Sequence, residues 1–239
     1  MIRKVTALAV LLSLTVTVVP AGAATSSPAL SSQSAAAIAT AAQSTALATK
    51  SCNIVETFYS NVKATGTLTT LASATQSQQV LTMPSIVNEL RLVNNTVYFK
   101  GNKQDISMQF GVTNSKFANR WVSVKAPDAN FAPMSKVMSF RTVVTELLGI
   151  SQPKKGAIST QLGHRVIAIT GTPKGSGAPA GAVITEYVST TAPYLPIETV
   201  GSYTSGKVKV QFVVKYISWG KTVSVSVPSP SVPISTTDL

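Results

Sequence analysis

The segment KVKVQFVVKYIS, residues 207–218, decides the fold class of this chain. Apolar side chains occupy every second position, and Lys or Gln fills most of the positions between them. This alternation is the period of a β-strand that turns one face to a core and the other to solvent. The segment therefore predicts a half-buried strand in an antiparallel sheet. The apolar face comprises Val208, Val210, Phe212, Val214 and Tyr216, and the opposite face carries Lys207, Lys209 and Lys215.

Further runs rich in β-branched and aromatic residues, bounded by turn signals, occur along most of the chain. The pair Asn94-Asn95 between two of these runs indicates a hairpin, because Asn tolerates positive φ. A sheet of eight or more strands curls instead of staying flat. The strands are expected at residues 62–68, 79–83, 86–93, 96–100, 121–124, 165–170, 183–189, 196–200 and 222–227.

Three other segments have helical spacing. Residues 33–59 place apolar side chains three or four positions apart, which predicts one long helix. Residues 104–119 and 130–150 show the same spacing, and Gly149 is a candidate C-cap. A helix, a group of strands, a helical pair and further strands indicate an α+β fold. We expect a curled antiparallel sheet, a half-barrel, packed over helices with an apolar cavity between them.

The N-terminus has the three parts of a secretory signal peptide. Arg3 and Lys4 precede an uncharged, mostly apolar run at 5–19, and small residues follow up to Ala23. At about 1.5 Å per residue the run reaches about 22 Å, which is less than the ~30 Å core of a bilayer. We therefore expect cleavage at Ala23, a secreted or extracytoplasmic product and no transmembrane span. The expected parts are a signal peptide at 1–23, a flexible linker at 24–32, a single domain at 33–228 and an extended, peripheral tail at 229–239.

Composition excludes several kinds of site. The chain has 20 Lys and Arg against 8 Asp and Glu, a formal net charge of +12, yet only 12% charged residues. A single Cys, Cys52, and a single His, His164, leave no internal disulfide and no Cys-rich or paired-His metal site. Cys52 follows the apolar run too late for a lipid anchor, and we expect it to be buried on the first helix. His164 has no visible catalytic partner. We expect no enzyme activity and no cofactor, and the scattered positive charges do not favour nucleic acid.

Short motifs along the chain resemble landmarks of one known class of proteins. VYFKG at 97–101, RWVSV at 120–124, EYV at 186–188, PYLPI at 193–197 and the strand from Val210 to Val223 resemble, in order and spacing, the LolA-like superfamily. They are most similar to secreted actinobacterial lipoproteins of the LppX and LprG type. The resemblance implies a half-barrel sheet over helices, a hydrophobic cavity for acyl chains and a role in carrying lipids or lipoproteins. The chain departs from those lipoproteins because it lacks their lipid-anchoring Cys, which leaves a membrane-anchored position in doubt.

Two functions remain open at this point. The first is a non-catalytic, monomeric protein that holds a lipid or lipoprotein acyl chain in its cavity. The second is a structural or interaction protein of the cell surface with a fully packed core, in which Lys207, Lys209 and Lys215 contact an anionic envelope surface. An apolar cavity of roughly 300 Å³ or more would distinguish the first from the second. The residues expected to line the cavity are Phe110, Met138, Phe140, Leu147, Phe212 and Val214.

Overall fold

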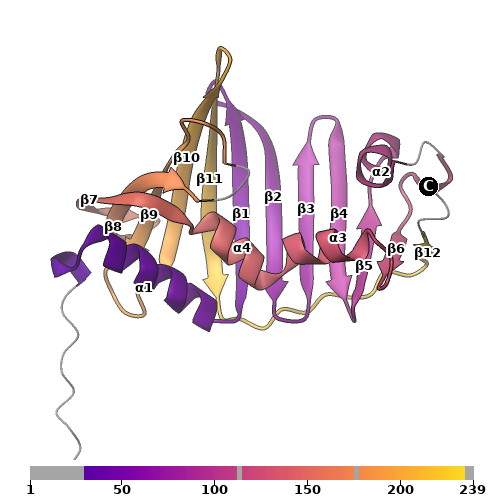
Figure 1. Cartoon of the computed structure of the whole chain (residues 1–239), viewed down its shortest axis with the longest axis horizontal. Helices are drawn as coiled ribbons and strands as arrows, with labels where there is room; N and C mark the ends of the chain where they lie inside the picture. The colour runs from indigo at the N-terminus through magenta and orange to yellow at the C-terminus, as the bar shows by residue number, and fades with distance from the viewer. Residues whose placement is uncertain (1–29, 112–114, 175–177, 235–239) are drawn as a thin grey trace, which may run out of the picture.

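A computed structural model describes residues 30–111, 115–174 and 178–234. Their main feature is a curled sheet of 12 strands with helices packed on one face (Figure 1). The predicted α+β class, with a half-barrel sheet over helices, is confirmed. The predicted signal peptide with Ala23, and most of the predicted linker, lie outside the described residues.

The sheet consists of two antiparallel meanders that meet where β1 pairs with β11. Its strand order is β12-β6-β5-β4-β3-β2-β1-β11-β10-β9-β8-β7. The first meander contains β1 Ser51–Ser60, β2 Lys63–Ser73, β3 Ser77–Met83, β4 Ile86–Val93, β5 Thr96–Lys100 and β6 Val122–Lys125. The second contains β7 Ile150–Gln161, β8 His164–Pro173, β9 Val183–Ser189, β10 Pro196–Ser205 and β11 Val208–Trp219. The two-residue strand β12, Val232–Pro233, pairs in parallel with β6.

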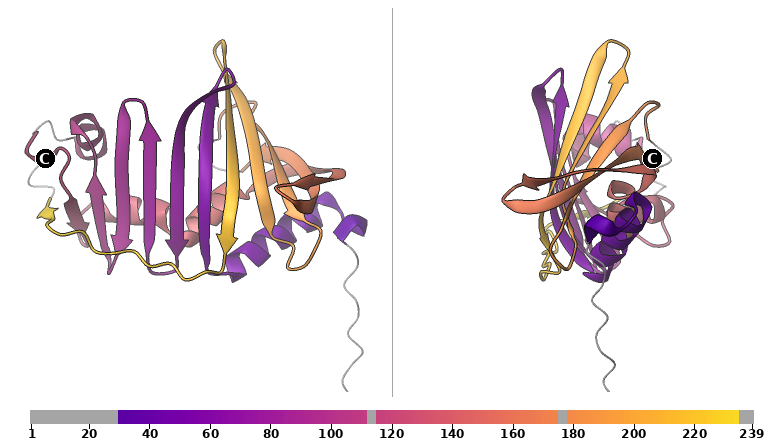
Figure 2. Two further views of the ribbon diagram at one scale, coloured as in Figure 1. Left: turned by 180° about the vertical axis from the view of Figure 1, so that it is seen from behind. Right: turned by 90° about the vertical axis from the view of Figure 1, so that its left-hand side faces the viewer.

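The helices α1, α3 and α4 lie in a row across one face of the sheet, which we call the concave face (Figure 1). Figure 2 shows the other, convex face and the strong curl at the β7–β9 end. Two 3-10 helices lie before α1 and after α2. The bounds are Leu30–Ser32 for η1, Ala35–Ala48 for α1, Lys103–Phe110 for α2, Ser115–Phe117 for η2, Phe131–Met138 for α3 and Phe140–Leu147 for α4.

The first helix is shorter than predicted. It ends at Ala48, the Thr49 N–H closes its last turn, and Lys50 adopts a positive φ of 63°. The following residues, SCNIVETFYS, are rich in the β-branched and aromatic side chains that favour strands, and they form β1. The prediction of one helix over 33–59 was therefore wrong beyond Ala48. Cys52 lies on β1 and not on a helix, but its predicted burial is confirmed.

The predicted helix at 130–150 is interrupted. Ser139 has extended backbone angles (φ −66°, ψ 137°), so it ends α3 and begins α4. Its hydroxyl accepts a hydrogen bond from the Thr142 N–H, as an N-cap residue does. Leu148, and not Gly149, is the C-cap of α4. This break lets two short helices follow the curve of the sheet.

The C-terminal part also differs from the prediction. Residues 222–227 form no strand and run along one end of the strands (Figure 2). The segment is held there by a hydrogen bond from the Val225 N–H to Gln76 Oε1 and by one from Arg91 Nη1 to the Ser226 carbonyl. Beyond it Ile234 is buried, so the expected peripheral position of the tail is wrong at that residue. Leu30, in the predicted linker, is likewise buried under α1.

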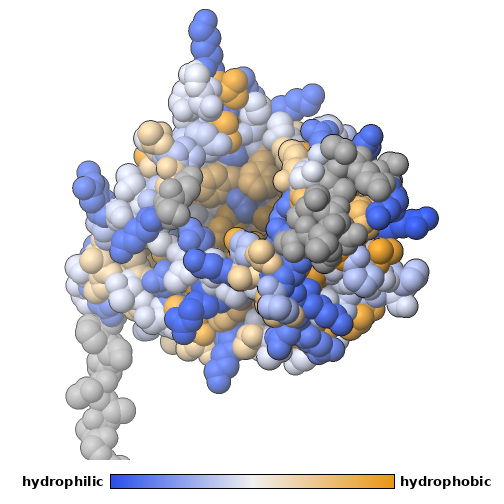
Figure 3. Space-filling model, turned by 45° about the vertical axis from the view of Figure 1, so that its right-hand side comes forward, coloured by the Kyte–Doolittle hydropathy of each residue, from blue (hydrophilic) through white to orange (hydrophobic). Residues whose placement is uncertain are grey.

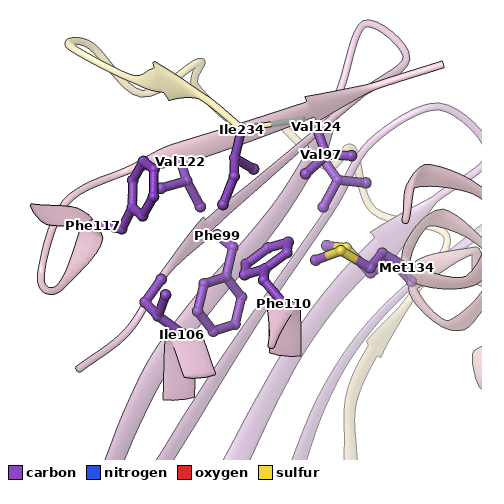
Figure 4. Close-up of a cluster of buried hydrophobic side chains, with 10 residues drawn as sticks. Val97, Phe99, Ile106, Phe110, Phe117, Val122, Val124, Met134 and Ile234 are labelled. Atoms are coloured by element: carbon purple, nitrogen blue, oxygen red, sulfur yellow. The ribbon is translucent and has the colours of Figure 1, made fainter. Parts of the chain in front are cut away.

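Three hydrophobic clusters fill the space between helices and sheet. The one at the β5–β6 end joins α2, α3 and the buried Ile234 (Figure 4). Within it, the Phe99 and Phe110 rings meet edge to face with centroids 5.5 Å apart. The other two clusters lie under α4 and under α1. In α1 the packed face consists of Ile38 and small alanines, which allow the helix to approach the sheet closely.

Candidate ligand-binding groove

A groove opens between the concave face and the pair α3–α4. Its volume is about 460 Å³, above the roughly 300 Å³ at which ligand pockets begin. A space-filling view shows the molecule hollowed on this side, with hydrophobic residues deep in the hollow (Figure 3). The sheet wall consists of Ile54, Glu56, Leu68, Thr70 and Gln79, and the helix wall consists of Pro133, Lys136, Val137, Thr142, Val143, Glu146 and Leu147.

The walls follow from strand and helix periodicity. On β1 and β2, alternate residues face the groove, so Glu56 and Leu68 are cross-strand partners on the same face. Val143 and Leu147 are four residues apart on α4 and present one side of that helix to the sheet. The lining is therefore set by alternate residues of the neighbouring strands β1–β3 and by the sides of α3 and α4 that face them.

Glu56 is the ionisable group on the sheet wall of the groove. Its strand neighbours on this face are Leu68 of β2 and Val214 of β11, and burial raises the pKa of its carboxyl to about 7. Within the described residues, no hydrogen bond or salt bridge reaches this carboxylate. The salt bridge between Arg91 Nε and Glu89 Oε1, 2.7 Å long, lies on β4, outside the groove lining. A carboxyl with these surroundings changes charge near neutral pH.

A second buried acid lies farther along the concave face. Glu186 on β9 is 0% exposed, and neither of its carboxylate oxygens has a hydrogen-bond partner among the described residues. Burial raises its pKa to about 8. Tyr216 lies between the two acids: burial and the charge of Glu186 raise the pKa of its hydroxyl well above the usual value, and the charge of Glu56 contributes in the same direction. The Tyr216 hydroxyl is within 3.0 Å of Thr199 Oγ1.

The six residues predicted to line a cavity are distributed between groove and core. Leu147 lines the groove. Phe110 and Met138 lie in the cluster of Figure 4, and Phe140 and Val214 lie in the cluster under α4. Phe212 is half-buried on the same concave face, and its ring covers Gly201 of the neighbouring strand so closely that a Cβ there would clash. Of the six, Leu147 lines the groove, and the other five lie in or against the hydrophobic clusters.

The three predicted basic residues do not form one patch. Lys207 and Lys209 lie at the tip of the β10–β11 hairpin, whereas Lys215 lies farther along β11, beside Glu198 of β10. All three side chains are exposed. The tip of the β1–β2 hairpin is hydrogen-bonded to the tip that carries Lys207 and Lys209, because Asn61 Oδ1 accepts a hydrogen bond from the Lys209 N–H.

Glu56 was not predicted as a site residue. It falls in the segment 51–60, which the sequence pattern assigned to the long helix. A lone acid in a run of apolar and β-branched residues was the available signal. Read as a strand, the same segment would have placed Glu56 on the face of Ile54 and Phe58.

Other findings concern the described part of the chain as a whole. His164 is exposed at the start of β8. Across 30–111, 115–174 and 178–234 there is no group of three or more His, Cys, Asp or Glu that could hold a metal ion. None of the described helices is both long and apolar enough to cross a membrane. A larger hollow of about 680 Å³ lies at the β5–β6 edge of the sheet, and its lining includes Tyr98, Ser123 and Pro233.

Comparison with known proteins gives similarity of fold only. No protein-family profile and no curated protein matches the chain. Among solved structures, LprF from Mycobacterium bovis is 16% identical over 82% of this chain and 98% of its own, with a TM-score of 0.47. A chain of the Pseudomonas aeruginosa MucA/MucB complex is 8% identical over 80% of this chain and 58% of its own, with a TM-score of 0.40. A LolA superfamily protein from Nitrosomonas europaea is 8% identical over 81% of this chain and 96% of its own, with a TM-score of 0.32. The chain is similar to these proteins in fold, and no function follows from that similarity.

Proposed function

We propose that this chain is an extracytoplasmic, non-catalytic protein that binds the acyl chain of a lipid or lipoprotein in the groove between its concave face and α3–α4. The single observation that supports the proposal is the groove itself. It has the volume of a ligand site and its walls are mostly apolar. Export rests on the signal-peptide pattern of residues 1–23.

The position of the groove suits a long, flexible apolar ligand. It lies between two layers, on a wall of extended strands, and it is open at its mouth, so an alkyl chain can enter it from solvent. Each methylene removed from water contributes about 0.8 kcal/mol. Burial of a few methylenes therefore gives useful affinity without any specific polar contact.

The test fills the groove and leaves the rest of the chain intact. Leu68→Trp places a large ring in the groove, because Leu68 is half-buried on the concave wall. Leu71→Trp is the matched control, since three positions along the same strand the side chain points to the convex face. Native mass spectrometry of each protein, purified from its own envelope, measures the bound lipid. Lipid on the wild type and on Leu71→Trp, but not on Leu68→Trp, is expected; an equal load on all three contradicts the proposal.

A second candidate, contact with an anionic envelope surface, is favoured by the paired hairpin tips. Figure 1 shows the β1–β2 and β10–β11 tips projecting together beyond the neighbouring strands. They carry exposed Lys63, Lys207 and Lys209, and the apex residue Val62 is 81% exposed. Each lysine near an anionic surface contributes about 1 kcal/mol. Such a contact is compatible with ligand binding in the groove.

Sedimentation with phosphatidylglycerol-containing vesicles tests this candidate. The double variant Lys207→Gln/Lys209→Gln is expected to lose most of the bound fraction. Lys215→Gln, on the same strand but away from the tip, is expected to keep it. Equal binding by both variants, or binding that is indifferent to vesicle charge, would exclude contact through the tips.

A further inference from the structure

The charge inside the groove is opposite to that of the chain as a whole. Basic residues outnumber acidic ones by 20 to 8, yet the groove lining holds Glu56 and Glu146 against Lys136 alone. Lys136 and Glu146 are exposed on the helices at the mouth, whereas Glu56 is on the inner wall. Lys136 and Glu146 offset each other in formal charge at the mouth, so the charged group that a ligand meets on the inner wall is the Glu56 carboxylate.

No cation in the described residues neutralises Glu56. The groups that face it are Ile54, Leu68, Val214 and the lining of the groove, and the neighbouring titratable groups on the sheet are acidic or neutral. Of the titratable groups on the surrounding elements, Lys136 on α3 and Glu146 on α4 line the groove with Glu56, and Cys52, Tyr216 and Glu186 are buried on the sheet. The cations Lys63 on β2, Lys215 on β11 and Arg141 on α4 are exposed and lie outside the groove lining. With Glu186 and Tyr216 behind it, the inner wall has no positive partner to offer a carboxylate or phosphate.

We propose that the groove selects amphiphiles that carry an amino group, with the Glu56 carboxylate as the partner of the ammonium and the apolar walls as the site of the alkyl chain. This inference rests on the proposed function, because it names the ligand class of the same groove. An ammonium supplies the missing counter-charge and donates hydrogen bonds to an acceptor that receives none from residues 30–111, 115–174 and 178–234. An anionic head would instead be repelled by Glu56 and Glu146.

The three probes dodecylamine, dodecanol and dodecanoate share one alkyl chain and differ in head group. Isothermal titration below their micelle concentrations measures their binding to the full chain. Dodecylamine is expected to bind wild type at least about 10-fold more tightly than dodecanoate, since hydrogen bonds to charged groups are stronger than those between neutral groups. Glu56→Gln should remove this preference without changing the affinity for dodecanol. The rim variant Glu146→Gln should keep most of it.

The pH profile gives an independent readout. An unliganded Glu56 that titrates at a pKa of about 7 is mostly protonated at pH 6 and mostly ionised at pH 8. Affinity for dodecylamine should therefore rise roughly 5- to 10-fold from pH 6 to pH 8, since only the ionised form binds the ammonium. Glu56→Gln should flatten this rise.

The outcomes separate the head-group inference from the proposed function. Equal binding of all three probes, abolished by Leu68→Trp, would overturn the preference for amines but leave the acyl-chain groove intact. A preference for dodecylamine that persists in Glu56→Gln would also overturn it. If no probe binds, the proposed function fails together with the inference.

Discussion

Replacement of Glu186 by Gln should make the protein more stable at neutral and alkaline pH, and hardly at all at acid pH. The carboxyl is fully buried without a hydrogen-bond partner among the described residues, and burial raises its pKa from 4.5 to about 8. Below pH 4.5 Glu186 is protonated in both the folded and the unfolded chain, so its ionisation costs no folding stability. As the pH rises towards 8 the unfolded chain releases the proton first, so folding stability falls. At 1.36 kcal/mol per pKa unit, the loss is of the order of 3 kcal/mol by pH 7.

Urea unfolding followed by tryptophan fluorescence at pH 5, 6, 7 and 8 measures this effect. The gain in unfolding free energy of Glu186→Gln over wild type should grow by about 3 kcal/mol between pH 5 and pH 8. Glu146→Gln is the control, because Glu146 is exposed on α4 and should leave the pH dependence unchanged. Glu56 titrates in the same direction and remains in both variants. A gain of the same size at pH 5 and pH 8 would refute the argument from burial.

Three further predictions concern packing, backbone strain and the thiol. Met138→Ala leaves a cavity at a fully buried position in the cluster of Figure 4. It should lower the unfolding free energy, measured by urea unfolding, by about 2–5 kcal/mol, and a loss under about 1 kcal/mol would contradict tight packing. Val62→Asn should raise it by about 1 kcal/mol, because Val62 has a φ of 67° that a β-branched residue disfavours; a lower thermal midpoint would be the contrary result. Cys52 should react with a thiol reagent only after unfolding, since burial raises its pKa to about 12, and rapid labelling of the native protein would oppose this.

Local signals predicted the strands well where they were strong. The strands β4, β5 and β9 begin and end at the predicted residues, because each is bounded by turn residues or by an abrupt change of composition. The positive φ angles of Asn94 and Asn95, 51° and 55°, confirm the predicted hairpin turn. In these segments the local sequence was sufficient to predict the strands.

Non-local pairing explains what the sequence did not reveal. The edge strand β7 has the sequence ISQPKKGAISTQ, with Pro, Gly and two Lys, and most of its side chains are exposed. Edge strands carry such residues to avoid pairing with other chains, so β7 has no apolar alternation to detect. The apolar spacing of β1 also fits a helix, and pairing with β2 and β11, which lie on either side of it in the sheet, favours the strand.

The groove could be predicted only in part for the same reason. The cavity between helices and sheet was expected, but its position depends on how α3 and α4 divide at Ser139 and lie over β1–β3. Of the six residues expected to line the cavity, Leu147 lines the groove because it lies on the side of α4 that faces β1 and β2. Residues such as Met138 and Val214 have the same apolar character but lie deeper, where they pack against other side chains.

Photoaffinity labelling with a dodecylamine that carries a diazirine at the end of its chain tests most directly whether an alkyl chain lies in the groove. After irradiation, digestion and mass spectrometry locate the labelled residues. The label is expected on the two walls, within residues 54–79 and 133–147, and it should be lost in Leu68→Trp but not in Leu71→Trp. Labelling that spreads over exposed residues of the convex face, or that persists at the same residues in Leu68→Trp, would contradict binding in this groove.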